Sequence, residues 1–407
     1  MTSTPRLSPL QVLACGALIV TLSMGIRHGF GLWLQPITQA QGWTRENFAF
    51  AMAIQNLAWG CFGIFAGMAA DRFGAFRVLV GGAVLYGLGL AGMALTTTPL
   101  GFALTTGVLI GAAQAGTTYA VIYGVIGRQI PAEKRSWAMG VAAAAGSFGQ
   151  FLMVPVEGAL IAQLGWQNAL LVLGVAVLLI APLAWGLREP GFAGGQPPQR
   201  EQTIGQALRE AFGYRSFQLL MAGYFVCGFQ VVFIGVHMPS YLKDNGLSPQ
   251  VASYALALIG LFNVVGTYMA GSLGQRMAKK HILAFIYFAR AAVIAIFLWA
   301  PLTPTSVYIF SAVMGLLWLS TVPPTNATVA QIFGVAHLSM LGGFVFFSHQ
   351  IGSFMGVWLG GVLYDQTGSY DIVWYISIAL GVFAALINLP VRESPITRGP
   401  QRMGAAA

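Results

Sequence analysis

Residues 67–77 read Gly-Met-Ala-Ala-Asp-Arg-Phe-Gly-Ala-Phe-Arg, a short polar turn between two long apolar runs. These runs, at about 47–70 and 77–97, are each long enough to cross a bilayer, which takes about 20 apolar residues. Long apolar runs and short polar turns alternate in the same way on both sides of this stretch. The pattern therefore predicts a series of membrane-spanning helices.

The composition of the 407 residues supports this prediction. Apolar residues make up 57% of the chain and charged residues 8%, against about 25% charged residues in a soluble domain. So much apolar surface with so few charges excludes a cytosolic enzyme, a nucleic-acid-binding protein and a disordered chain. The net charge of +9 is scattered over short loops and does not form a polyphosphate-binding surface. The three cysteines lie in apolar runs without a CxxC partner, and we expect neither a disulfide framework nor a metal site.

Twelve apolar runs have the length of a membrane span. They cover about 10–34, 47–70, 77–97, 100–124, 138–163, 166–187, 216–241, 249–272, 281–301, 305–328, 338–363 and 371–391. The sequence predicts an all-α membrane protein. Its expected parts are an N-terminal six-helix bundle (1–190), a cytoplasmic linker with a short surface helix around 203–212 (191–215), and a C-terminal six-helix bundle with a cytoplasmic tail (216–407).

The basic residues predict the orientation of these spans. Of the 20 lysines and arginines, only Arg45 and Lys243 fall in turns on one side, and only Arg27 and Arg290 lie inside spans. All the others lie in turns or tails on the opposite side. Because positive charge concentrates on the cytoplasmic side, we expect a multi-pass protein of the cytoplasmic membrane with both termini in the cytoplasm.

The two halves of the chain repeat one another. Gly42, Gly67, Arg72 and Gly111 recur 204 residues later, as Gly246, Gly271, Arg276 and Gly315. Pro36 and Gly165 recur 203 residues later, as Pro239 and Gly368. We infer a duplication, which is the plan of transporters that hold the substrate between two pseudo-symmetric halves near the membrane midplane.

The turn at 67–77 fits the pattern G-x-x-x-D-R-x-G-x-x-R, which resembles the signature loop of the major facilitator superfamily. A second copy runs from Gly271 to Arg276, with Gln275 in place of the aspartate. Glycine at these positions lets two helix ends approach closely. The neighbouring charged residues can form charge-assisted hydrogen bonds between those ends. We predict a conformational latch made of Gly67, Asp71, Arg72, Arg77, Gly271 and Arg276. A mere positively charged turn is the alternative.

Small residues favour the same architecture. Span two carries Gly60, Gly63 and Gly67, and span eleven carries Gly352, Gly356 and Gly360. In the superfamily that this chain resembles, these two spans face each other across the halves. The resemblance therefore implies that the two glycine faces meet and slide, with static packing as the alternative.

Three further segments, 30–36, 42–45 and 352–361, resemble bacterial members of the monocarboxylate and oxalate–formate porter group. That resemblance implies transport of small organic anions, often with a proton. Monocarboxylate porters carry an aspartate and a substrate-binding arginine in span eight, where this chain has Asn263 and Thr267. If the substrate is a carboxylate, its cation must come from elsewhere in the chain.

Two ionisable residues inside spans are candidates for that chemistry, since each costs about 2.5–3.5 kcal/mol at the centre of a span. Arg27 in span one and Glu157 in span five lie at matching depths, and we predict that they pair or share a hydrogen-bond network. They are either a structural ion pair, or a substrate-anion ligand with its counter-ion or proton carrier, or they do not meet.

Other polar residues lie in the spans that line the cavity in the superfamily. The candidate substrate-binding residues are Arg27, His28, Gln114, Tyr119, Gln230 and His349. His349 is also a candidate for proton coupling, and simple packing is the alternative for both histidines. The Pro323–Pro324 pair predicts a kink in span ten. Three positions are open for the side chain of Arg290 in span nine. It points to the inner end of the span, it pairs with a polar neighbour, or it reaches the cavity.

The predicted function is a secondary active transporter that moves a small organic anion, in the first place a carboxylate, by alternating access. A proton is the candidate symported ion. The alternatives are an exporter of hydrophobic or cationic compounds and a non-transporting membrane sensor. Without HExxH, GxSxG, paired carboxylates or a nucleotide-binding loop, we expect no enzymatic activity, cofactor, ATP or nucleic acid. The expected partners are the substrate and membrane lipid, and the expected state is a monomer.

Overall fold

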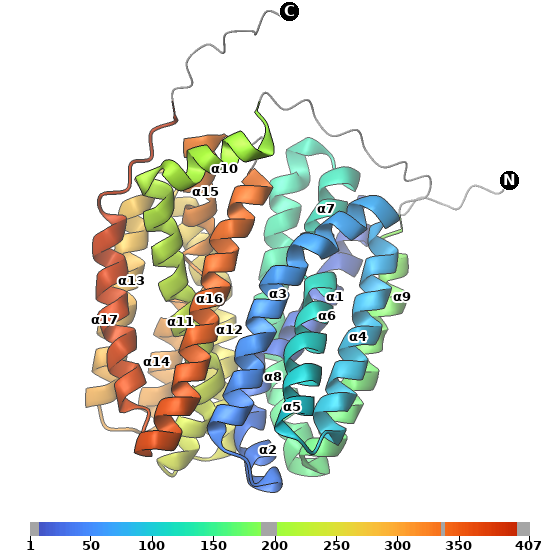
Figure 1. Cartoon of the computed structure of the whole chain (residues 1–407), viewed down its shortest axis with the longest axis vertical. Helices are drawn as coiled ribbons and strands as arrows, with labels where there is room; N and C mark the ends of the chain where they lie inside the picture. Colours follow the sequence, from blue (N-terminus) through green and yellow to red (C-terminus); the bar gives the residue numbers. More distant parts are fainter. Residues whose placement is uncertain (1–7, 189–201, 335–337, 397–407) are drawn as a thin grey trace, which may run out of the picture.

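The chain is helical throughout in the computed structural model, which describes residues 8–188, 202–334 and 338–396 (Figure 1). Ten segments of this described part are long and apolar enough to cross a membrane. One of them, Trp137–Trp185, has 49 residues and turns back at Gly165, so it supplies two spans. α3 (Arg45–Phe73) also runs the height of the molecule. The predicted twelve spans in two six-helix bundles are confirmed.

The helices follow the order of the two predicted halves. The N-terminal bundle contains α1 (Pro9–His28), η1 (Phe30–Trp33), α2 (Leu34–Gln41), α3, α4 (Ala75–Leu95), α5 (Pro99–Phe102), η2 (Ala103–Leu109), α6 (Ile110–Thr117), α7 (Tyr119–Gln129), α8 (Ala132–Ala176), η3 (Val177–Leu179) and α9 (Ile180–Trp185). The C-terminal bundle contains α11 (Arg215–Asp244), α12 (Pro249–Leu273), α13 (Lys279–Trp299), α14 (Pro304–Leu317), α15 (Val322–Phe333), α16 (Leu338–Thr367) and α17 (Asp371–Asn388).

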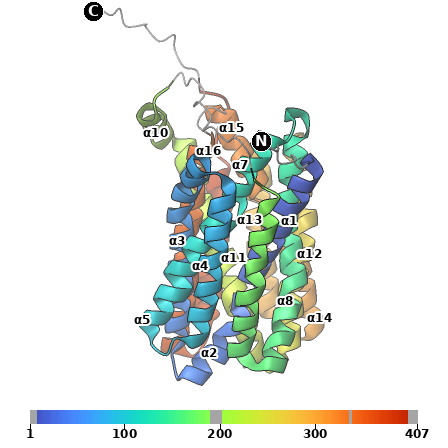
Figure 2. The same cartoon turned by 90° about the vertical axis from the view of Figure 1, so that its right-hand side faces the viewer.

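A short helix, α10 (Ile204–Gly213), lies across one end of the molecule, and α2 marks the other end (Figures 1 and 2). We call these the α10 end and the α2 end. Thr203 begins α10 with a capping box, in which its side chain and that of Gln206 bond each other's backbone N–H groups. Residues 191–201 of the expected linker lie outside the described residues.

Equivalent turns of the two halves share the same backbone conformation. Gly42 and Gly246 end the first spans of the two bundles with φ of 66° and 83°. Gly165 and Gly368 have φ of 75° and 72° before the last span of each bundle. Other residues rarely adopt this left-handed region, so glycine at both copies of each turn reflects one inherited backbone path.

The duplication also extends to helix packing. A Cβ atom on Gly111 of α6 would lie 2.6 Å from the carbonyl oxygen of Gln55 in α3. A Cβ atom on Gly315 of α14 would lie 2.8 Å from the carbonyl oxygen of Ile259 in α12. Both partners of the second contact are 204 residues beyond those of the first. The two bundles therefore repeat the same close helix crossing, as the sequence repeat predicts.

The expected meeting of glycine faces is only partly correct. α3 does pack on α16, where Gly60 lies against Gln350. Gly352 and Gly356, however, face α11 within their own bundle, where a Cβ atom would lie 1.9 and 2.4 Å from backbone carbonyl oxygens. The glycine face of α16 is filled by the backbone of α11, which runs parallel to it, so it is not free to slide along α3.

We predict that Gly352→Ala destabilises the protein, because the new methyl group overlaps the carbonyl oxygen of Phe225 at 1.9 Å. Overpacking of this kind costs on the order of 1–3 kcal/mol, which is measured as a lower unfolding temperature. The control is Gly63→Ala in α3, which meets no atom within 4 Å. If both variants unfold at the wild-type temperature, the described α11–α16 packing is wrong.

Candidate functional site

A cavity of about 60 Å³ lies between the two bundles, where α1 and α3 approach α11 and the end of α14. The N-terminal bundle contributes most of its polar side chains and the C-terminal bundle mainly apolar ones. The lining consists of Arg27, His28, Phe30, Gly31, Met52, Gln55, Asn56, Gln150, Val231, Val232, Gly235, Val236 and Trp318. The cavity is thus polar on one wall and apolar on the other.

Arg27 of α1 is the cation of the polar wall. Its Nη1 donates to the side-chain oxygens of Gln55 and Gln114, both at 3.2 Å, and its Nη2 donates to Asn56 Oδ1 at 2.7 Å. The guanidinium also lies 4.4 Å from the centre of the Trp59 ring. Side chains from α3 and α6 therefore hold the guanidinium at the cavity.

These partners leave both charge and donors available. A guanidinium has five N–H groups, and three hydrogen bonds hold Arg27. All three acceptors are neutral amides, and no carboxylate forms an ion pair with Arg27 in the part of the chain that the structure describes. The site therefore combines an uncompensated positive charge with two N–H groups for a ligand.

The predicted pairing of Arg27 with Glu157 is wrong for this conformation. Glu157 is fully buried, and its Oε2 accepts from the indole N–H of Trp33 at 3.1 Å. Its carboxyl group occupies the space beside Gly29, where a Cβ atom would lie 1.9 Å from Oε2. Residues two positions apart on a helix face about 200° apart, so Glu157 meets the side of α1 opposite Arg27. Arg27 and Glu157 were predicted at equal depth in the membrane, but they do not lie on the same side of α1.

The other candidates of the N-terminal bundle divide between the cavity and the packing around it. His28 lines the cavity, and its Nδ1 donates to the Met24 carbonyl at 2.6 Å. Gln114 is fully buried and supports Arg27. Tyr119 lies farther toward the α10 end, where its hydroxyl packs against Gly146 of α8.

The candidates of the C-terminal bundle point into that bundle. Gln230 is fully buried, donates to the Ser377 carbonyl at 2.8 Å and accepts from Arg290. The expectation that Gln230 binds substrate is therefore not met in this conformation, because both halves of its amide already have partners. His349 lies against Tyr224, and its Nδ1 donates to Gln350 at 3.0 Å.

The glycines of the predicted latch do not touch the opposite bundle in this conformation. Gly67 has no atom within 4 Å of a Cβ position, and Arg72 and Arg77 are exposed. Arg276 is also exposed, and Gly271 approaches only Pro323. The side chain of Asp71 lies outside what the structure describes. The two copies of the motif stand at the α10 end without contact between the glycines and the opposite bundle.

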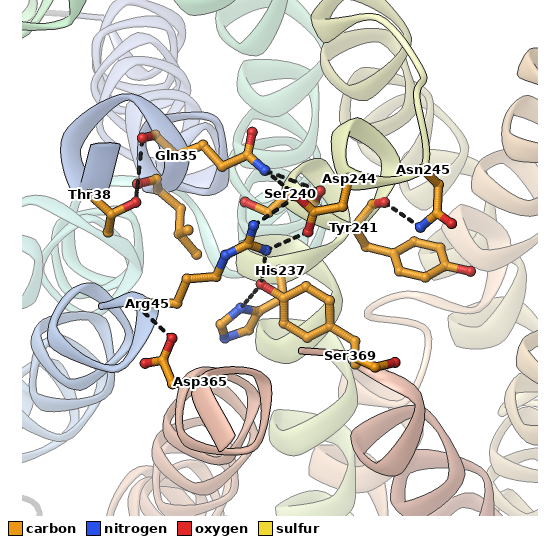
Figure 3. Close-up of polar contacts among 12 residues, drawn as sticks. Gln35, Thr38, Arg45, His237, Ser240, Tyr241, Asp244, Asn245, Asp365 and Ser369 are labelled. Carbon is orange, nitrogen blue, oxygen red and sulfur yellow. Dashed lines mark hydrogen bonds and ion pairs between the residues drawn. The ribbon is translucent and has the colours of Figure 1, made fainter. Parts of the chain in front are cut away.

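A polar cluster that the sequence analysis missed joins the bundles at the α2 end (Figure 3). Arg45 of α3 donates to both carboxylate oxygens of Asp244 in α11, at 2.6 and 2.8 Å. The same guanidinium donates to the Tyr370 hydroxyl at 2.8 Å and lies 3.7 Å from the centre of the Tyr364 ring. We call Arg45, Asp244, Asp365 and Tyr370 the α2-end clamp.

Asp365 completes the clamp from the other side. Its carboxylate accepts from the backbone N–H groups of Arg45 and Glu46, at 3.1 and 2.7 Å. A carboxylate stabilises a helix N-terminus because these N–H groups have no partner within the helix. A residue of the C-terminal bundle therefore caps a helix of the N-terminal bundle. The sequence did contain a signal for this contact, since opposite charges stand in the equivalent loops of the two halves. Arg45 follows Gly42, and Asp244 precedes Gly246.

Backbone contact reinforces the clamp. A Cβ atom on Gly31 of η1 would lie 2.2 Å from the carbonyl oxygen of Gly235 in α11, so the two bundles touch directly beside the cavity. Toward the α10 end, neither Gly63 nor Gly67 of α3 meets an atom within 4 Å. The bundles are therefore in close contact at the α2 end, whereas Gly63 and Gly67 of α3 have open space beside them among the described residues.

Comparison with known proteins gives consistent results. The sequence model of the Major Facilitator Superfamily matches residues 13–339 and 220–405. The uncharacterized MFS-type transporter YcxA of Bacillus subtilis is 23% identical over 96% of each chain. The probable sulfoacetate transporter SauU of Cupriavidus necator is 25% identical over 87% of this chain and 86% of that protein.

Two further similarities concern a transporter sequence and a solved fold. Monocarboxylate transporter 12 of Rattus norvegicus is 24% identical, with 70% of this chain and 65% of that protein aligned. The crystal structure of a bacterial homologue of the human lysosomal transporter Spinster superposes with a TM-score of 0.76. It covers 96% of this chain and 99% of that chain at 17% identity. The overall fold is therefore that of a solved transporter.

We predict that Asp244→Asn opens the α2 end, because it removes the charge that Arg45 holds. If the closed α2 end loses about 1–2 kcal/mol of stabilisation, the ratio of closed to open molecules falls about 5- to 30-fold. The measurement uses spin labels on Ala40 and Asn245 in a variant without the native cysteines. Double electron–electron resonance would then show a second, longer distance between the two labels.

Two variants make this measurement specific. Lys279→Gln removes an ion pair with Glu393 (3.8 Å) inside the C-terminal bundle and should leave the distance unchanged. Exchanging the charges, as Arg45→Asp with Asp244→Arg, should restore much of the short distance. A single wild-type distance in Asp244→Asn would show that the clamp does not hold this end closed.

Proposed function

Because the chain belongs to the Major Facilitator Superfamily, we propose that it is a secondary transporter that moves a small organic anion across the cytoplasmic membrane by alternating access. The observation that carries this proposal is Arg27. It is a cation at a cavity between the bundles, held by three amide oxygens and without a carboxylate partner among the described residues.

The physical argument is one of charge. Amide dipoles satisfy hydrogen bonds but do not cancel a charge, and an ionised group inside a membrane protein is costly without a counter-charge. A carboxylate that enters the cavity supplies that counter-charge and accepts hydrogen bonds from the remaining N–H groups of Arg27. Such charge-assisted bonds are among the strongest hydrogen bonds. Arg27 takes the place of the span-eight cation that Asn263 and Thr267 do not provide.

The relatives support an anionic cargo. The names of two of them specify a monocarboxylate and sulfoacetate, which are both organic anions. The residues we assign to substrate binding are Arg27 and His28 at the cavity, with Gln55, Asn56 and Gln114 as the groups that orient Arg27. His349 and Tyr119 stay candidates for another stage of the cycle.

We assign the α10 end to the cytoplasm, from the excess of Lys and Arg in its loops. The conformation described here is then the inward-open stage, with the α2-end clamp closed. The latch residues Gly67, Asp71, Arg72, Arg77, Gly271 and Arg276 would meet when the α10 end closes. The open space beside Gly63 and Gly67 of α3 supports this order.

Glu157 is our candidate for the proton site. Its carboxyl group is fully buried, with one donor from Trp33, and its Oε1 has no partner among the described residues. An isolated carboxylate is expensive to bury, so such groups exist in the neutral, protonated form when no cation is near. A change of surroundings during rocking would release the proton.

We predict that Arg27→Gln abolishes carboxylate binding, and that Arg27→Lys weakens it because an ammonium lacks the planar fork. The measurement is ligand-induced thermal stabilisation with mono- and dicarboxylates, aromatic acids, sugars and organic cations at two pH values. A ligand at a hundredfold excess over its Kd stabilises by about 2.7 kcal/mol.

Arg209→Gln, at an exposed position of α10, serves as the control and should bind as the wild type does. If carboxylates fail to stabilise the wild-type protein and only organic cations or lipophilic compounds do, the proposal is wrong. The exporter function would then replace it.

We predict that Glu157→Gln removes the pH dependence of binding while it preserves binding itself, because the amide oxygen still accepts from Trp33. In the wild-type protein, one linked proton raises the affinity for the carboxylate by up to about tenfold for each pH unit lowered. Titrations at several pH values measure this slope. Asp371→Asn, at an exposed position, is the control. An unchanged slope in Glu157→Gln would exclude Glu157 as the proton site.

A further inference from the structure

The tenth span is interrupted beside the cavity. α14 ends at Leu317 and α15 begins at Val322, and Pro323 and Pro324 lie in the first turn of α15. Prolines cannot continue the helical ladder of N–H bonds from the preceding turn. Backbone groups exposed at such a break must find partners inside the protein, since the bilayer offers none.

Arg290 of α13 supplies partners for the carbonyl groups of the break. Its Nε and Nη2 donate to the Leu317 carbonyl at 3.1 and 2.7 Å, and Nη2 also donates to the Trp318 carbonyl. Its Nη1 donates to Gln230 at 3.4 Å, and the whole side chain is buried. A cation at the carboxyl end of a helix also interacts favourably with the helix dipole.

Asn263 of α12 supplies a partner for an amide group of the same break. Its Oδ1 accepts from the Leu319 N–H at 2.9 Å and from Thr267 at 3.0 Å. Its Nδ2 donates to Ser147 of α8, in the other bundle, at 2.8 Å. Side chains of two different helices therefore fix the backbone on both sides of Trp318.

The sequence repeat allows the position of Arg290 to be compared with the equivalent position of the N-terminal bundle. Arg27, Tyr86 and Gln114 of the N-terminal bundle correspond to Gln230, Arg290 and Trp318, with offsets of 203, 204 and 204 residues. Each triad is joined by hydrogen bonds and contains one arginine. In the first triad the arginine is on a helix that lines the cavity, and in the second it lies behind the wall.

Trp318 is what Arg290 holds in that wall. The indole lines the cavity and is 1% exposed, yet its N–H has no hydrogen-bond partner among the described residues. An unsatisfied buried donor costs about 1–3 kcal/mol. The ring therefore does not lie here because of its own hydrogen bonding. The anchored backbone on both sides determines its place.

We propose that Arg290 is a positioning residue of the cavity, which fixes Trp318 as the surface that meets the uncharged part of a bound organic anion. The substrate-binding part of this inference rests on the proposed function, with Arg27 as the anchor of the anion. Arg290 acts on the ligand through Trp318 and does not reach it. A purely structural role for Arg290 would stabilise the bundle without affecting how Trp318 meets a ligand.

The first test needs no ligand. The protein is labelled with 5-fluorotryptophan, and the ¹⁹F resonance of Trp318 is assigned by its loss in Trp318→Phe. Arg290→Gln should shift or broaden the Trp318 resonance, and Arg290→Lys should restore part of it. The resonance of Trp33 in the other bundle should not change. Ser377→Ala, which removes a buried unpaired hydroxyl of the same bundle, should leave both signals in place. An unchanged Trp318 resonance in Arg290→Gln overturns the proposal.

The second test measures binding of phenylacetate by thermal stabilisation in a double-mutant cycle. Trp318→Phe keeps an aromatic ring and removes an unsatisfied donor, and its unfolding temperature without ligand is the reference for this half of the cycle. Arg290→Gln should weaken phenylacetate binding about tenfold, within the range of coupled neighbours. In the Trp318→Phe protein, the same change should weaken binding no further.

The outcomes separate the two proposals. If the two losses in affinity add, or if Arg290→Gln binds phenylacetate as the wild type does, Arg290 does not act through Trp318 and the inference is wrong. If no carboxylate stabilises the wild-type protein but the Trp318 resonance responds to Arg290→Gln, the organic-anion function fails and the positioning of Trp318 stands.

Discussion

A guanidinium inside a membrane-spanning bundle needs partners for its N–H groups, and Arg27 and Arg290 meet that requirement in different ways. Arg27 uses amide side chains of neighbouring helices and remains at the cavity with charge and donors available. Arg290 uses backbone carbonyls exposed by a broken helix and lies wholly behind the cavity wall. The polar and apolar walls of the cavity follow from this difference.

The same requirement explains the departure from monocarboxylate porters in span eight. The resemblance to these porters implies an aspartate and an arginine where this chain has Asn263 and Thr267, and Asn263 accepts from a backbone N–H of span ten. A neutral amide is suited to that task because it accepts from Leu319 and donates to Ser147 at once. With span eight engaged in packing, the cation that lines the cavity is Arg27 of span one.

The contacts between the bundles are concentrated at one end. Arg45 and Asp244 pair there, Asp365 caps α3 from the opposite bundle, and the backbones of Gly31 and Gly235 nearly touch. At the other end, Gly67 of the signature loop has open space at its Cβ position, and Arg72 and Arg77 are exposed. The duplication relates the two bundles and leaves the two ends of the molecule different, so each end can have a closure of its own.

The sequence by itself determined the twelve spans, the two bundles and their repeat, because bilayer thickness and glycine-dependent turns leave local signatures in the chain. It also identified Arg27 as an ionisable group that needed an explanation. Only the tertiary structure decided its partners. Arg27 and Glu157 lie at one depth but on opposite sides of α1, and helix rotation is set by packing with α3, α6 and α8. Likewise, the clamp joins residues about 200 or more positions apart, and Arg290 meets carbonyls released by a break in another helix. Such pairings depend on how helices rotate and cross, which no local pattern records.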